Sequence, residues 1–187
     1  MKKETAQIYQ VKIELEDIHP PIWRRLLVSG DINLGKLHEV IQGAMGWTNT
    51  HLHEFEIIGE TYSDPEAEID DSRNELQYRL SQVAPPAGES FLYLYDPGDG
   101  WEHHILVEEI APADIRFPGH PVCLAGARAC PPEDCGGPFG YEDFLSAITN
   151  PKHKRHKEMR DWIDDEFDAE NFDLAETNEI LKAPFGL

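Results

Sequence analysis

Apolar and polar residues alternate along the N-terminal part of the chain. Between Ile8 and Glu16 every second residue is apolar, and this period of two is typical of a strand with one buried face. The segment His19-Pro20-Pro21 interrupts the pattern, and Ile22 to Val28 resembles a second strand. Because the connection between the two is short, the pattern predicts an antiparallel hairpin.

A helix and a third strand are predicted next. Apolar residues recur at helical spacing from Leu34 to Met45, between Asn33, a suitable N-cap, and Gly46, a suitable C-cap. A strand follows from Leu52 to Ile58. The order strand, strand, helix, strand predicts a β-grasp-like (ubiquitin-like) mixed sheet with the helix packed across one face. Three helical residues are expected to be buried: Leu37, Ile41 and Met45.

The second half of the chain carries an added hairpin and helices. The acidic stretch from Glu60 to Glu75 is typical of a long exposed loop, and Leu76 to Val83 of a short strand with a turn. Phe91 to Tyr95 and Trp101 to Glu109 flank Asp96-Pro97-Gly98-Asp99-Gly100, which predicts a β-hairpin. Three C-terminal helices are expected, at Phe139–Ile148, Lys157–Phe167 and Asp173–Leu181.

Together these elements predict a single α+β domain over residues 1–187. The β-grasp-like sheet and its crossing helix occupy residues 6–110, an ordered loop rich in Cys, Pro and Gly occupies 111–140, and helices occupy 139–187. A length of 187 residues, of which 40% are hydrophobic, is sufficient for one core of this kind.

The segment from Gly126 to Gly140 is the least compatible with regular structure. It contains two cysteines, three prolines and four glycines, a composition that neither a helix nor a central strand tolerates. Prolines reduce the entropy lost on folding and glycines permit sharp turns, so we expect Cys130 to Gly137 to be ordered. Shaped loops on a rigid scaffold often carry binding residues.

The net charge of the chain limits the classes of partner that it is expected to bind. Lys and Arg total 16 against 36 Asp and Glu, a formal net charge of −20. This surface repels phosphate backbones and anionic membranes, so we expect a protein or small-ligand partner, not direct binding to duplex DNA. The sequence has no apolar run of membrane-spanning length and no apolar core of a secretory signal. Three cysteines do not suggest a disulfide framework, and the expected location is the cytoplasm.

Five segments together carry a family resemblance. In chain order they are Pro20-Pro21-Ile22-Trp23-Arg24-Arg25; Leu37-His38-Glu39-Val40-Ile41 with Gly46-Trp47; His51-Leu52-His53-Glu54-Phe55; Tyr95-Asp96 with Gly98-Asp99-Gly100-Trp101-Glu102-His103; and Ala129-Cys130-Pro131-Pro132-Glu133-Asp134-Cys135-Gly136-Gly137 with Gly140-Tyr141. In this order they resemble the root-inducing-plasmid ORF-three family, whose members are sometimes labelled resolvase-like proteins of mobile elements.

The resemblance runs from about Ile8 to the C-terminal helices and implies an α+β domain, but no particular reaction. Pro97 departs from the aromatic residue usual in the family. The resolvase label has no support here, because a serine recombinase needs a nucleophilic serine in an arginine-rich site and a basic DNA-binding region. Neither is visible in this sequence, and neither is the helix-turn-helix module that accompanies some relatives.

A zinc site is one chemical hypothesis. The candidate ligands are Cys123, Cys130 and Cys135, of which only the last two have the usual close spacing of a zinc pair. A histidine would complete the set, drawn from His51, His53, His103 and His120. The alternative is that the cysteines are small buried residues that lock the loop. Zinc or another transition metal is thus the candidate cofactor.

A cluster of histidines and carboxylates is a second hypothesis. His51, His53, Asp96, Asp99 and His103 lie at strand ends or tight turns, where they could converge on a transition metal or perform acid–base chemistry. The alternation also places these histidines on faces shared with apolar residues, where a hydrogen-bonded core histidine is the commoner outcome.

The remaining candidates are polar or aromatic residues near the same segments. Arg24 could hold an anionic group, or pair with an acid across the sheet. The basic run from Lys152 to Lys157 could touch nucleic acid or an acidic partner, although a solvated helix start is favoured. The other binding candidates lie on the hairpin tip, in the loop and just after it: Trp101, Arg128, Glu133, Asp134 and Tyr141.

The favoured function is a binding domain. Its recognition surface for a protein or small ligand would combine the loop at Cys130 to Tyr141 with the hairpin tip at Asp96 to Trp101. The competing hypothesis is a metal-dependent hydrolase or nuclease associated with mobile elements and built on His51, His53, Asp99 and His103. An enzyme requires those groups within a few ångströms of one another in a concave site, and the sequence leaves open whether they meet.

Overall fold

The computed structural model describes residues 6–113, 117–163 and 167–182. Its centre is an eight-stranded sheet with the order β5-β4-β3-β6-β7-β1-β2-β8. The strands are β1 Gln7–Leu15, β2 Trp23–Ser29, β3 His53–Ile57, β4 Glu60–Ser63, β5 Arg73–Asn74, β6 Ser90–Tyr95, β7 Trp101–Pro112 and β8 Val122–Ala127. Every pairing is antiparallel except that of β4 with β5.

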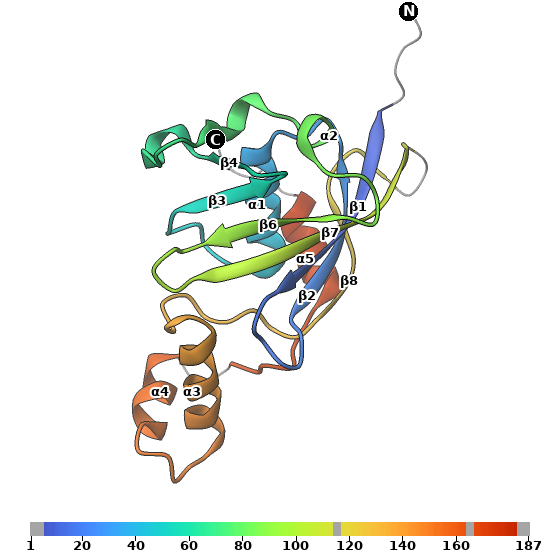
Figure 1. Cartoon of the computed structure of the whole chain (residues 1–187). Coiled ribbons are helices and arrows are strands. Elements are labelled where there is room, and N and C mark those ends of the chain that lie inside the picture. Colours follow the sequence, from blue (N-terminus) through green and yellow to red (C-terminus); the bar gives the residue numbers. More distant parts are fainter. Residues whose placement is uncertain (1–5, 114–116, 164–166, 183–187) are drawn as a thin grey trace, which may run out of the picture.

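The helices divide into two groups (Figure 1). Helix α1 crosses one face of the sheet, and α5 lies beside it against β8. Helices α3 and α4 form a separate pair at the end of the sheet where the β6–β7 hairpin turns. The bounds are α1 Leu34–Met45, α2 Leu80–Val83, α3 Gly137–Thr149, α4 His156–Trp162 and α5 Leu174–Lys182, with short 3₁₀ turns at Pro65–Ala67 and Glu75–Gln77.

Local sequence signals account for the elements nearest the core. The Asn33 side chain accepts a hydrogen bond from the Lys36 amide, and Gly46 ends α1 in the left-handed region at φ 95°. The expected burial of Leu37, Ile41 and Met45 is confirmed, since each is at most 3% exposed. The two predicted hairpins are also confirmed, as β1 pairs with β2 and β6 pairs with β7.

The mixed α+β class is confirmed, whereas the finer β-grasp topology is not. Strand β1 is antiparallel to both of its neighbours, β2 and β7. Strand β3 pairs with β4 and β6, away from the N-terminal hairpin. The β6–β7 hairpin is therefore inserted in the middle of the sheet instead of being added to its edge.

Three local predictions were wrong. The acidic stretch expected to be one exposed loop contains β4 and β5, and β5 forms the edge of the sheet, where a short polar strand is tolerated. Residues 76–83, expected as a strand, form the end of a 3₁₀ turn and helix α2. The segment 111–140, expected as loop, contains β8, whose small residues gave no alternation to detect although it pairs with β2. The predicted end of the second C-terminal helix, at 164–166, lies outside the described residues.

Candidate functional site

The loop of residues 130–136, called the rim loop below, is fixed against the tip of the β6–β7 hairpin. The indole Nε1 of Trp47 donates to the Pro131 carbonyl at 2.9 Å, and the Gly136 amide donates to Asp99 Oδ2 at 2.9 Å. Gly137 has φ 71°, and a Cβ there would lie 2.2 Å from the Asp99 carbonyl oxygen. Close backbone contact, possible only for glycine, thus places the loop beside the hairpin.

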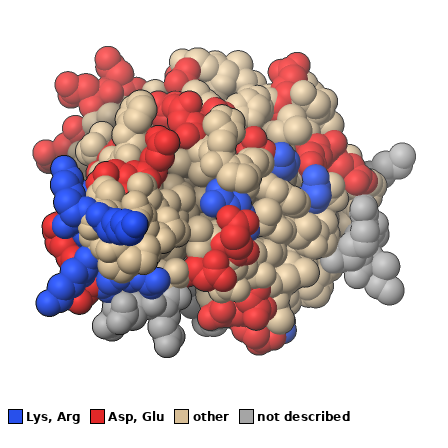
Figure 2. Space-filling view, turned by 90° about the horizontal axis from the view of Figure 1, so that it is seen from below, with Lys and Arg blue, Asp and Glu red and all other residues tan. Residues whose placement is uncertain are grey.

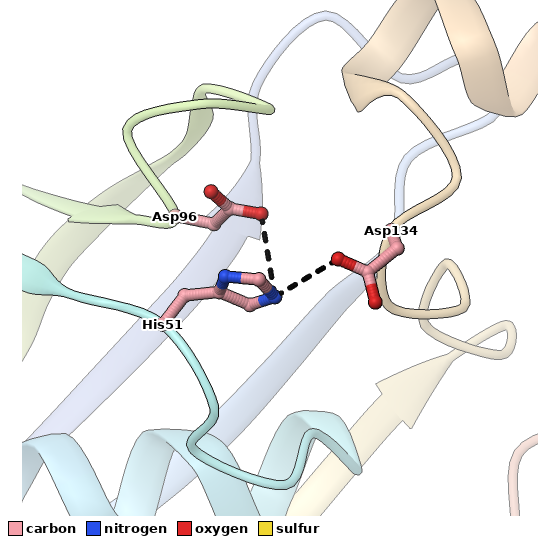
Figure 3. Close-up of side chains that lie close together, drawn as sticks. All are labelled: His51, Asp96 and Asp134. Carbon is pink, nitrogen blue, oxygen red and sulfur yellow. Dashed lines mark ion pairs between the residues drawn. The ribbon is translucent and has the colours of Figure 1, made fainter.

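Where the rim loop meets the hairpin, three carboxylates surround one imidazole. Nε2 of His51 lies 3.1 Å from Asp134 Oδ1, 3.6 Å from Glu133 Oε2 and 3.7 Å from Asp96 Oδ2. None of these approaches has hydrogen-bond geometry, and Nε2 is a buried atom without a hydrogen-bond partner. Figure 3 shows the ring of His51, just before β3, pointing between Asp96 at the end of β6 and Asp134 in the rim loop.

Asp96 and Glu133 are held by their own neighbours. Oδ1 of Asp96 accepts from the amides of Gly98 at 3.0 Å and Asp99 at 3.3 Å, which leaves Oδ2 facing His51. The Glu133 carboxylate accepts from the Thr48 amide at 2.8 Å and from the Tyr95 hydroxyl at 3.1 Å. Burial raises the pKa of Tyr95, so its hydroxyl remains a donor at neutral pH. Asp134 differs because its side chain is 72% exposed.

This arrangement has the composition of a cation site. His51, Asp96 and Asp134 can each offer one ligand atom, and these atoms all lie within 4.8 Å of one another. One nitrogen with carboxylate oxygens suits a transition metal better than Ca²⁺ or Mg²⁺, which prefer oxygen alone. The prediction from sequence included all three residues and Glu133, but did not separate them from Asp99 and His103.

The cysteines do not take part in such a set. All three are free thiols, and among the described residues no group of three potential metal ligands includes Cys123, Cys130 or Cys135. Burial raises the pKa of each thiol, that of Cys135 to about 12. Cys123 belongs to the core cluster and the other two cysteines pack against it, which fits the alternative weighed from the sequence, that they lock the loop.

Five other candidates are built into the interior. Within the described part of the chain, Arg24 donates only to carbonyl oxygens, among them those of Ala44 at 2.9 Å and Arg128 at 2.9 Å, so its guanidinium is engaged by the backbone. Arg128 is buried and donates to the Pro20 carbonyl and to Glu170. The side chains of three more candidates are at most 1% exposed: Trp101, His103 and Tyr141.

His53 belongs to a different group from His51. Its Nε2 lies 2.8 Å from Glu75 Oε2, and its ring stacks on that of His38 with centroids 3.4 Å apart. The ring of Tyr93 contacts those of His53 and His103, and the ring of Trp47 contacts that of His103. Since Trp47 also donates to the rim loop, these rings connect both histidines to the loop indirectly. Sequence reasoning missed His38 and Glu75. His38 was detectable, since it lies in the apolar stripe of α1.

One basic residue, Arg155, lines a cavity that Asp134 of the carboxylate cluster also lines. Figure 2 shows Lys and Arg gathered over the α3–α4 end of the molecule, while Asp and Glu are spread over much of the same face. Arg155 in this group is paired with Asp143 at 2.8 Å and with Glu158 at 3.2 Å. Internal ion pairs therefore offset part of the basic run from Lys152 to Lys157.

Comparisons with known proteins place the chain in a family. Residues 7–176 match the family described as "Plasmid pRiA4b ORF-3-like protein". The chain belongs to this family. It is 40% identical over 182 residues to "Uncharacterized protein y4hQ" of Sinorhizobium fredii (strain NBRC 101917 / NGR234), which covers 94% of this chain and 91% of that protein. The match confirms the resemblance that the five sequence segments carry.

A solved structure has the same fold. The crystal structure of a protein of unknown function, MM3350 from Methanosarcina mazei Go1, superposes with a TM-score of 0.84 at 34% identity. The match covers 92% of this chain and 98% of that one. None of the helices in the described part of the plasmid pRiA4b ORF-3-like chain is long and apolar enough to span a membrane.

Proposed function

We propose that the protein is a binding domain whose recognition site is the junction of the rim loop and the hairpin tip around His51, and that a divalent transition-metal ion binds there. The observation that carries the proposal is the buried Nε2 of His51, which has no hydrogen bond and faces carboxylate oxygens of Asp96, Glu133 and Asp134 at 3.1 to 3.7 Å. A buried polar atom without a partner is rare in proteins and calls for a ligand or another explanation.

Charge supports the same conclusion. Three carboxylates that face one imidazole repel one another, and a bound cation would turn that repulsion into attraction. The ligands come from three segments: the turn before β3, the end of β6 and the rim loop. A metal would therefore cross-link the loop to the sheet and give a protein or small-ligand partner a fixed surface, with open coordination positions as a contact.

A metal-dependent hydrolase is the second candidate. The observation in its favour is that His51 also lines a cavity of about 550 Å³ between α1 and the segment before β3. A metal at the edge of a cavity can activate water for attack on a bound substrate. The nuclease form of this hypothesis is weakened by the net charge of −20, because duplex DNA binds through phosphate neutralisation.

Isothermal titration of the chelator-treated protein with Zn²⁺, Co²⁺, Mn²⁺ and Mg²⁺ tests the binding proposal. We expect one equivalent of a transition metal to bind, with at least about tenfold weaker affinity in Asp134→Asn, which loses one charged ligand. Asp143→Asn on α3 is the matched control and should bind as the unmodified protein does. Absence of stoichiometric binding, or equal affinity in both variants, would contradict the proposal.

The hydrolase hypothesis has its own measurement. Nitrophenyl ester and phosphate hydrolysis by the metal-loaded protein would support it only if Asp134→Asn abolishes the activity and Asp143→Asn retains it. A salt-titrated duplex-binding assay on metal-free and metal-loaded protein addresses the nuclease form. We expect no appreciable binding to duplex DNA at physiological salt. Micromolar, steeply salt-dependent binding by the metal-free protein would instead support the nuclease hypothesis.

A further inference from the structure

The cavity beside α1, which His51 also lines, contains a second pair of titratable side chains, His53 and Glu75. It is lined by the first turns of α1, by residues 49–53 and by Asp64, Glu75 and Leu76, and its volume of about 550 Å³ is in the range of small-ligand sites. Two of its buried polar groups are His53 and Glu75, whose side chains are 7% and 4% exposed.

The pair of His53 and Glu75 fixes one ring nitrogen and leaves the other available. Nε2 of His53 lies 2.8 Å from Glu75 Oε2, so the Nε2 proton is donated to the carboxylate, and in the neutral ring Nδ1 carries the lone pair. Nδ1 has no hydrogen bond to any described residue, and this atom is not fully buried. A carboxylate that orients an imidazole in this way is typical of histidines that bind a ligand through the other nitrogen.

Helix α1 is shaped to receive the Glu75 carboxylate. A Cβ on Gly35 would lie 3.0 Å from Glu75 Oε1 and 2.7 Å from Leu76 Cδ2, so a larger residue at this position would displace both. The carboxylate thereby lies against the first turn of the helix, where the backbone dipole favours a negative charge. Glu75 is held in place from two sides.

The neighbouring His38 has no ring nitrogen left for a ligand. Nδ1 lies 2.7 Å from the Tyr93 hydroxyl and Nε2 lies 2.8 Å from Asn49 Oδ1, so the hydroxyl donates to one and the amide oxygen accepts from the other. Burial, with the His53 ring beside it, lowers the pKa of His38 to about 3. His38 is therefore neutral, and its ring supports the face of His53.

The charges around the cavity select the ligand. Three acids line it, Glu39, Asp64 and Glu75, with one lysine, Lys36, which pairs with Glu39 at 2.8 Å. The other basic side chains in the lining are the imidazoles of His38, His51 and His53. An anionic ligand would be repelled. We propose that the cavity binds a small organic cation, a primary amine or guanidine compound, which donates an N–H to Nδ1 of His53 within this negative field. This inference does not rest on a metal at His51.

A matched series of probes tests the ligand class. In the presence of chelator, the full chain is titrated with n-butylamine, n-butanol and butyrate, with the histidine side-chain NMR signals as readout. We expect butylamine to bind with a dissociation constant of about 1 mM or lower and to shift the His53 signals, and the neutral and anionic analogues to bind at least about tenfold more weakly. Equal binding of butylamine and butanol would overturn the proposal.

Two variants locate the site. His53→Gln should weaken butylamine binding about tenfold or more, since it removes the acceptor. Leu76 is 55% exposed, so Leu76→Lys adds a positive charge to the cavity lining without altering the buried pairs. This variant should weaken butylamine binding to a similar extent. His104→Gln should bind as the unmodified chain does. If His53→Gln does not fold, the test rests on Leu76→Lys. Undiminished butylamine binding by the Leu76→Lys variant would contradict the proposal.

Discussion

The interior of the sheet and the rim beside it each contain a histidine whose Nε2 has no hydrogen bond, in opposite surroundings. His103 is 0% exposed, its Nδ1 lies 3.0 Å from the Trp101 carbonyl, and the rings of Trp47 and Tyr93 surround it. His51 faces three carboxylates instead. Burial among rings lowers the pKa of His103 to about 4, so it is neutral and suited to packing. At the rim, three carboxylates surround the Nε2 of His51, which lacks a hydrogen bond. Such negative surroundings suit a cation.

The largest expected effect is a loss of stability in acid that originates in the interior. The pKa of His103 is lowered to about 4 and that of His38 to about 3, below the unfolded value near 6.5. From pH 6.5 down to about 4 the unfolded state therefore binds more protons than the folded state, and each histidine lowers the free energy of unfolding by up to about 1.4 kcal/mol per pH unit. Well above pH 6.5 both histidines are deprotonated in the folded and the unfolded state, so they contribute no slope there.

Urea unfolding at a series of pH values measures this slope. His103→Gln keeps an amide donor for the carbonyls and removes one titrating group, so the slope between pH 6 and 4.5 should fall by about 1.4 kcal/mol per unit. His104→Gln, the next residue on the same strand, is the control. If His103→Gln and His104→Gln show the same slope, burial does not lower the pKa of His103 as expected.

The next effect concerns the rigidity of the rim. Gly137→Ala would place a Cβ 2.2 Å from the Asp99 carbonyl oxygen at φ 71°, so we expect a loss of about 3 kcal/mol or more in the free energy of unfolding. Gly59→Ala is a matched control with φ 75° and nothing within 4 Å of the added carbon, and should cost only about 1 kcal/mol. Equal losses measured by denaturant unfolding would show that the rim loop is not fixed against the hairpin.

A smaller effect is expected from Pro131→Gly in the rim loop. Glycine at this position gives the unfolded chain more freedom, which should lower the free energy of unfolding by about 1 kcal/mol. The Trp47 hydrogen bond to the carbonyl of residue 131 can persist, since it uses backbone. Chemical unfolding measures the change, and Pro86→Gly in a turn remote from the rim is the control. An undiminished stability would contradict a loop whose order depends on its prolines.

The smallest effect separates charge repulsion from ligand binding at the rim. In metal-free protein, Asp134→Asn removes one of three like charges near His51 and should raise the free energy of unfolding by a few tenths of a kcal/mol. Asp143→Asn loses its pairing with Arg155 and should lower it by a similar amount. Thermal unfolding at low salt compares the two. A loss of stability in Asp134→Asn would mean that its ion pair with His51 outweighs the repulsion.

Much of the fold was predictable because its signals are local. Helix α1 was recognised from its apolar period and from its caps Asn33 and Gly46, and the β6–β7 hairpin from its turn residues. Strands β4 and β5 were missed because their pairing, and not their composition, makes them strands. Strand β8 was missed for the same reason, since β2 supplies its hydrogen bonds.

The candidate site shows a sharper limit. The sequence by itself determined that histidines and acids lie at strand ends and tight turns, because turn chemistry and alternation act over a few residues. It named His51, Asp96, Glu133 and Asp134 together with residues that proved to be core. Only the tertiary structure decided which of them meet, because the sheet order and the glycine contact at Gly137 bring the rim loop to the hairpin. It also paired His53 with Glu75, a contact between distant segments that no local pattern encodes.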